Sequence, residues 1–162
     1  MDPTIKVTIP TSLFLLEFIE NVPIKLYSCE VNSLPEYIAY QGDVYQIEFY
    51  FDAKGKSQSR KYLEDMDGAD ARKFAHLLQM MGDIGQIRNK QKFRNEGNKV
   101  YAFKPQPHRF LCFFFSGNKI IITNAFMKKQ QKLPKPEKDR ALQCKEDYEK
   151  RVKERKYYGQ EY

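Results

Sequence analysis

The sequence predicts an α+β fold in which an antiparallel sheet of about four strands packs against a helical hairpin and a C-terminal helix. Apolar residues spaced three and four apart, which mark one face of a helix, occur in segments 67–81 and 134–152. Segments rich in β-branched and aromatic residues, which are typical of strands, occur at 44–51, 100–104, 109–115 and 119–126. An N-terminal extension precedes these elements.

Residues 1–43 are predicted to be this extension, or a small subdomain, whose role the sequence does not indicate. Residues 5–9 alternate like a short strand, and residues 13–20 can form a helix capped by the residues before them. Two prolines and a turn signal at 41–43 divide the region into short pieces.

The helical hairpin is predicted to follow the strand at 44–51 and its turn at 53–59. A short helix over 59–66 leads into a longer amphipathic helix, which begins at the N-cap Asp67 and stops at Gly82. The apolar face of the longer helix is formed by Phe74, Leu77, Leu78 and Met81. His76 lies inside this helix and is expected to be structural.

Three later strands are predicted to form an antiparallel meander, with turns at 105–108 and 116–118. The basic segment 86–99 before them contains glycine and asparagine and is predicted to be a loop. The sequences 113–115 and 120–122 are too apolar for a solvated sheet, so helices must cover one face and part of the other.

The last helix is predicted to begin at Pro134-Lys135-Pro136, because proline is tolerated in a first helical turn. Its apolar face is formed by Ala141, Cys144, Tyr148 and Val152. Residues 44–155 are therefore expected to form one domain, and residues 156–162 a frayed tail.

Composition narrows the class of protein. Apolar residues make up 41% of the chain and charged residues 30%, which is a globular balance. No apolar run reaches the roughly 20 residues of a membrane span, and no signal peptide is recognisable, so the cytosol is the expected compartment. Three widely spaced cysteines and two histidines indicate no disulfide framework and no metal site, and no cofactor is expected.

The positive charge is concentrated in one segment. Residues 1–85 hold 8 Lys/Arg against 13 Asp/Glu, residues 86–132 hold 11 against 1, and residues 133–162 hold 9 against 7. The middle segment has a single acid, Glu96, and cannot neutralise itself through internal pairs. It should therefore attract a polyanion such as nucleic acid, or an acidic protein.

The order of elements and two motifs resemble the RelE/ParE toxin superfamily, and within it the HigB-like, phage-derived branch. The first motif is the aromatic strand Arg109-Phe110-Leu111-Cys112-Phe113-Phe114-Phe115 with Lys104 before it. The second motif is the hairpin at 117–124 followed by Ala125-Phe126-Met127-Lys128-Lys129-Gln130-Gln131-Lys132-Leu133-Pro134. The resemblance covers roughly residues 45–152.

The resemblance implies the toxin of a type II toxin–antitoxin system, a metal-independent endoribonuclease that cleaves mRNA on the ribosome. It also implies a cognate antitoxin, often a helix-turn-helix protein in the HigB-like branch. The ParE branch inhibits DNA gyrase instead, so a gyrase inhibitor on the same fold is one alternative. A nucleic-acid-binding module without toxicity is another alternative.

Metal-free RNA cleavage needs a base, an acid and cations around the reacting phosphate. Arg109 occupies the position of the sheet arginine of the resembling toxins, and its planar fork can hold two phosphate oxygens. Lys104, Lys128 and Lys129 are expected to converge beside it. Crowded ammonium groups have lowered pKa values, so one of these lysines can accept a proton.

His108 is a further candidate, because histidine is the usual proton shuttle near neutral pH. Neighbours on a strand face opposite sides, however, so His108 and Arg109 share a pocket only if the turn twists. RNA contacts are expected from Lys132, Asn124, Lys119, Arg94 and Lys92. Relatives often carry tyrosine or histidine after the final strand, where this chain has Phe126-Met127-Lys128, so the general acid is not identified.

Overall fold

The computed structural model describes residues 37–158, which belong to one compact unit, Tyr37–Tyr162. The strand and helix predicted at 5–9 and 13–20 lie outside this part of the chain. The fold is α+β, as predicted. Its elements are β1 (Ile38–Gln41), β2 (Gln46–Phe49), α2 (Gln58–Glu64), α3 (Gly68–Gln79), the π-helical turn η1 (Met80–Ile84), β3 (Phe93–Gly97), β4 (Val100–Phe103), β5 (His108–Phe115), β6 (Lys119–Met127) and α4 (Lys135–Lys153).

Within residues 37–158 the sheet has six strands, so the prediction of about four strands was wrong. Their order is β1-β2-β6-β5-β4-β3. The prediction of an antiparallel sheet was also wrong, because β2 pairs with β6 in parallel and the sheet is therefore mixed. The two strands that were missed are the short edges: β1 lies in the segment assigned to the extension, and β3 lies in the predicted loop at 86–99. Edge strands bury little, so their sequences lack a strong apolar pattern.

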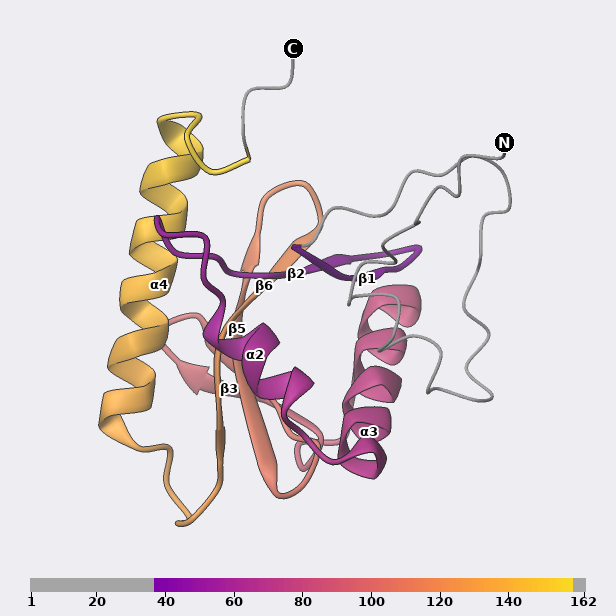
Figure 1. Ribbon diagram of the computed structural model, residues 1–162. Coiled ribbons are helices and arrows are strands. Elements are labelled where there is room, and N and C mark those ends of the chain that lie inside the picture. The colour runs from indigo at the N-terminus through magenta and orange to yellow at the C-terminus, as the bar shows by residue number, and fades with distance from the viewer. Residues whose placement is uncertain (1–36, 159–162) are drawn as a thin grey trace, which may run out of the picture. The chain divides into compact units, whose positions relative to one another are not determined.

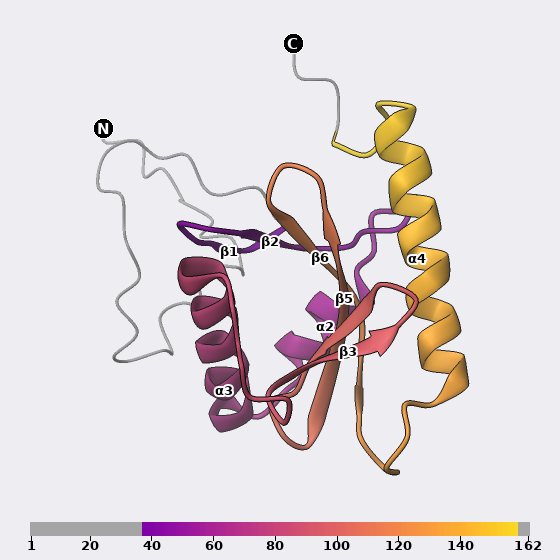
Figure 2. The same ribbon diagram turned by 180° about the vertical axis from the view of Figure 1, so that it is seen from behind.

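Helices cover both faces of the sheet (Figures 1 and 2). Successive side chains of β5 point to opposite faces of the sheet, as the two-residue period of a strand requires. Phe110 and Cys112 pack in the core beneath α2 and α3, whereas Leu111 and Phe113 pack in the clusters that include residues of α4. The antiparallel meander of β4, β5 and β6 is confirmed.

The helical hairpin is confirmed, with one correction at its end. The side chain of Asp67 accepts a hydrogen bond from Ala69 N at 2.8 Å and caps α3, as predicted. Gly82 does not stop the helix: it lies inside η1, and the chain turns at Gly85, where φ is +80°. A Cβ on Gly82 would lie 2.5 Å from the Tyr40 ring, so this glycine permits a close approach of β1.

The C-terminal helix is confirmed, and its apolar face includes the fully buried Tyr148. The tail after it is not frayed as far as residue 158. The Tyr157 hydroxyl accepts a hydrogen bond from Phe51 N at 2.8 Å. The Tyr158 hydroxyl contacts the Tyr148 hydroxyl and donates a hydrogen bond to the carboxylate of Glu48. Among the described residues, no helix is both long enough and apolar enough to cross a bilayer.

Candidate functional site

A pocket of about 780 Å³ lies between strands β3 to β6 and the N-terminal end of α4. The loop between β6 and α4 forms one of its walls. Basic side chains dominate the lining, and Glu96 is the single acid among the lining residues. The basic residues are Lys90, Arg94, Lys104, Arg109, Lys128 and Lys132.

The alternation of the strands explains why these side chains meet. Phe93, Phe103 and Phe110 pack in the core beneath α2 and α3, so the residues next to them face the other side of the sheet. Four neighbouring strands therefore direct a polar group to one surface. These groups are Arg94 and Glu96 on β3, Lys104 after β4, Arg109 on β5 and Lys128 after β6.

Arg109 is the most enclosed of these cations, with 6% of its surface exposed. One of its nitrogens, Nη1, donates a hydrogen bond to the carbonyl of His108 at 2.8 Å. Burial lowers the pKa of Arg109, and the charge of Glu96 opposes this shift. Phe126 is the cross-strand partner of Arg109, and both residues line the pocket.

Lys104 reaches the pocket from the end of β4, and its Nζ donates to the carbonyl of Lys90 at 3.1 Å. Its pKa is lowered, first by burial and then by the charge of Arg109, while Glu96 acts in the opposite direction. Arg94 and Lys128 add smaller lowering effects. Lys104 is thus a lysine whose proton is held less tightly than usual, within a group of cations.

Glu96 is one of two charged pocket residues, the other being Lys90, that the sequence did not single out as part of a site. Its side chain is 13% exposed, and one carboxylate oxygen lies 3.9 Å from Arg94 Nε. Its backbone carbonyl accepts a hydrogen bond from Lys138 Nζ of α4 at 2.9 Å, which ties the β3–β4 hairpin to the helix. The signal was its position as the single acid of a basic segment.

Several predicted site residues therefore lie together in one pocket: Arg94, Lys104, Arg109, Lys128 and Lys132. Lys92 and Lys129 are exposed and are not among the residues that line it. Only coordinates show that the amide side chains of Gln91, Gln106, Gln130 and Gln131 join these cations.

Asn124 and Lys119 are engaged elsewhere. Asn124 is fully buried, and its Nδ2 donates to the carboxylate of Glu137 at 2.8 Å, which fixes α4 to β6. Lys119 Nζ lies 3.2 Å from the fully buried carboxylate of Glu48 and over the ring of Tyr158. The structure thus gives both side chains partners within the fold and does not place them in the pocket.

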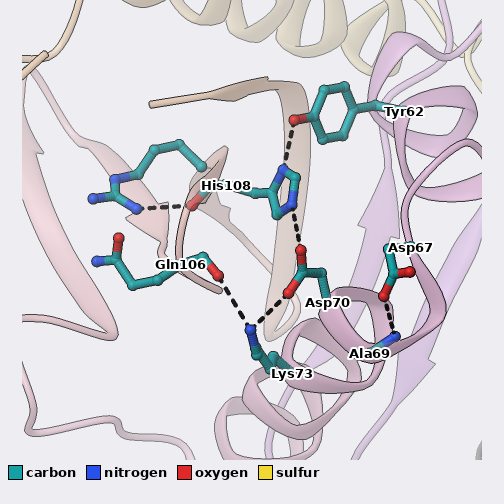
Figure 3. A network of polar contacts seen from close by, with 8 residues as sticks. Tyr62, Asp67, Ala69, Asp70, Lys73, Gln106 and His108 are labelled. Carbon is teal, nitrogen blue, oxygen red and sulfur yellow. Dashed lines mark hydrogen bonds and ion pairs between the residues drawn. The ribbon is translucent and has the colours of Figure 1, made fainter. Parts of the chain in front are cut away.

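His108 is directed to the opposite face of the sheet from Arg109, so the turn does not bring the two side chains together. Its Nδ1 lies 2.7 Å from the Tyr62 hydroxyl, and its Nε2 lies 3.0 Å from the Asp70 carboxylate (Figure 3). Lys73 donates to the same carboxylate at 2.6 Å. The structure therefore does not place His108 in contact with anything bound in the pocket.

Comparison with known proteins gives one family match. Residues 61–146 match the family described as Phage derived protein Gp49-like (DUF891), and all residues that line the pocket lie within this range. No curated protein matches the chain. The match covers just over half of the 162 residues, from α2 into α4. The chain therefore belongs to the Gp49-like family of phage-derived proteins, a toxin-type, RelE-like family of toxin–antitoxin systems.

Proposed function

We propose that this protein is the toxin of a toxin–antitoxin system and cleaves mRNA in its basic pocket without a metal. The observation that carries the proposal is the convergence of six basic side chains, with one acid, in a pocket of about 780 Å³. A site of this charge favours a polyanion, and a pocket of this size accommodates a short stretch of a nucleic-acid strand. Substrates in this class include single-stranded RNA.

The proposed reaction is attack of a ribose 2′-oxygen on the adjacent phosphorus. The new bond forms a 2′,3′-cyclic phosphate, and the bond from phosphorus to the 5′-oxygen of the next nucleotide breaks. In this scheme the neutral form of Lys104 takes the proton of the 2′-hydroxyl, and the ammonium of Lys128 gives a proton to the departing 5′-oxygen. No further reactant is needed.

The lowered pKa of Lys104 supports its role as proton acceptor, because it enlarges the neutral fraction near physiological pH. Arg109 is proposed to hold two phosphate oxygens and to stabilise the charge that develops on them. One guanidinium nitrogen already donates to the His108 carbonyl, and the remaining N–H groups are enough for a bidentate contact.

We also propose the partners of the reaction. The messenger is cut on the ribosome in the cytoplasm, as the resemblance to HigB-like toxins implies. A cognate antitoxin of the helix-turn-helix class neutralises the toxin. An acidic antitoxin segment is complementary to the basic pocket, which gives one physical route to inhibition.

Induction of the protein in bacterial cells tests the proposal. Sequencing of 5′ ends should show new ends within translated messages, and Arg109→Ala and Lys104→Ala should each reduce them at least tenfold at equal protein levels. Lys61→Ala is the control, because Lys61 is an exposed cation of α2 outside the pocket. Intact transcripts together with DNA damage would indicate a gyrase inhibitor and overturn the nuclease proposal.

A further inference from the structure

The turn between β4 and β5 contributes Gln106 to the lining of the basic pocket and forms hydrogen bonds with two further lining residues. The carbonyl of His108 accepts a hydrogen bond from Arg109 Nη1 at 2.8 Å. The carbonyl of Pro107 accepts one from the backbone N–H of Lys128 at 2.9 Å. The position of this turn therefore sets the position of Arg109 and of the strand end that carries Lys128.

The same turn is held from the opposite face of the sheet by side chains of α2 and α3 (Figure 3). The His108 imidazole lies between the Tyr62 hydroxyl at 2.7 Å and the Asp70 carboxylate at 3.0 Å. Lys73 completes the arrangement, because its Nζ donates to Asp70 at 2.6 Å and to the Gln106 carbonyl at 3.5 Å.

The chemistry of the groups defines their hydrogen bonds. The hydrogen bonds from Lys73 and from His108 lower the pKa of Asp70, so its carboxylate is ionised and can only accept. In the neutral imidazole, Nε2 then carries the hydrogen and Nδ1 accepts from Tyr62. All three polar groups are satisfied, and the imidazole has a fixed orientation.

This arrangement has the form of a carboxylate that orients a histidine, but the imidazole lies on the opposite face of the sheet from the pocket and is not part of its lining. His108 is 6% exposed, and its ring packs edge-on against that of Tyr62. The network therefore acts on the pocket only through the backbone of the turn. A displacement of about 1 Å at a reacting group can reduce a rate on the order of 100-fold, so a fixed turn matters for catalysis.

We propose that His108, held by Tyr62 and Asp70, is a positioning residue that fixes Arg109 in the pocket through the β4–β5 turn. The proposal rests on the proposed function only for its effect on cleavage. The position of the guanidinium can be measured without any reaction. Two readouts therefore separate this inference from the nuclease proposal.

The first readout is the NMR signal of the Arg109 Nε–H group in the full chain, assigned through its loss in Arg109→Lys. A held guanidinium gives a dispersed, sharp signal. Tyr62→Phe, Asp70→Asn and His108→Ala should each move this signal towards the position of a free arginine or broaden it. The first two substitutions keep the size of the side chain and guard against a His108 variant that fails to fold.

Tyr40→Phe is the matched control. Its hydroxyl donates to the Asp83 carboxylate at 2.8 Å, so this variant also loses a partly buried tyrosine–carboxylate hydrogen bond, but one between β1 and η1. The control should leave the Arg109 signal unchanged. An unchanged signal in Tyr62→Phe and His108→Ala, or an equal change in Tyr40→Phe, would overturn the positioning role.

The second readout is the cleavage of a single-stranded RNA by the same variants. His108→Ala should lower kcat roughly 100-fold with KM within about threefold, and His108→Gln should recover part of the loss. In an Arg109→Ala background the effect of His108→Ala should fall below tenfold, because it acts through the missing side chain. Full multiplication of the two effects would contradict the inference. Altered NMR signals in a protein that cuts no RNA would refute the nuclease proposal alone.

Discussion

The salt dependence of RNA binding tests the charge of the pocket directly. Six basic residues line it, and Glu96 cancels about one charge, which leaves about five cations for phosphates. Each phosphate contact on a single strand contributes about −0.7 to the slope of log K against log salt, so a slope of about −3.5 is expected. Affinity should then fall roughly 100-fold between 50 and 200 mM salt.

The change of this slope in variants of the pocket gives the number of phosphate contacts that the removed side chains make. Arg109→Ala should change it to about −2.8, and Arg109→Ala with Lys128→Ala to about −2.1. Fluorescence anisotropy with a 2′-O-methyl RNA oligonucleotide measures the slope without cleavage, because this strand lacks the attacking hydroxyl. Lys61→Gln removes one exposed cation of α2 and should leave the slope unchanged. Equal slopes for the pocket variants and the wild type would show that RNA binds elsewhere.

Three further predictions concern the pocket and the core. Glu96→Gln should tighten binding of the same oligonucleotide several-fold, because the charge of Glu96 opposes the neighbouring cations; weaker binding in anisotropy titrations would contradict this. Burial lowers the pKa of Lys104, so its ammonium destabilises the fold at neutral pH and ceases to do so as pH rises through the lowered pKa. Lys104→Met should therefore raise the Tm in calorimetry at pH 7 by about 2–4 °C, with a smaller gain in alkaline solution; a lower Tm would refute this. Phe74 is fully buried and stacks on Phe110 with the ring centroids 3.8 Å apart. Phe74→Ala should therefore reduce the free energy of unfolding, measured in urea titrations, by about 3–5 kcal/mol. A loss below about 1 kcal/mol would be inconsistent with this packing.

The central strands and the helices were predictable because their sequences repeat with the period of the structure they form. Phe110, Leu111, Cys112 and Phe113 alternate between the two covered faces, and the caps and apolar spacing of α3 and α4 locate both helices. The edge strands were not predictable in this way. β3 has the sequence FRNEG, which lacks an apolar alternation, and it is a strand through its hairpin pairing with β4.

The charge pattern of the sequence predicted that the candidate site is basic, but it did not predict which residues form the site. Asn124 and Lys119 are polar residues of β6, yet each contacts a carboxylate from another element, Glu137 of α4 or Glu48 of β2. These hydrogen bonds and ion pairs depend on how the elements pack against each other, so no local sequence pattern predicts them. Glu96 lies in the pocket through the local pairing of β3 with β4, a hairpin in the segment that was predicted to be a loop.

The sequence by itself determined that a basic segment of mainly antiparallel strands would present Arg109 and Lys104, because strand period and charge are local properties. The tertiary structure decided which other residues line the pocket with Arg109 and Lys104, and towards which face of the sheet the His108 side chain is directed. That decision depends on how β3 to β6 align and on where α2 and α3 pack, and both are fixed by contacts between residues distant in sequence.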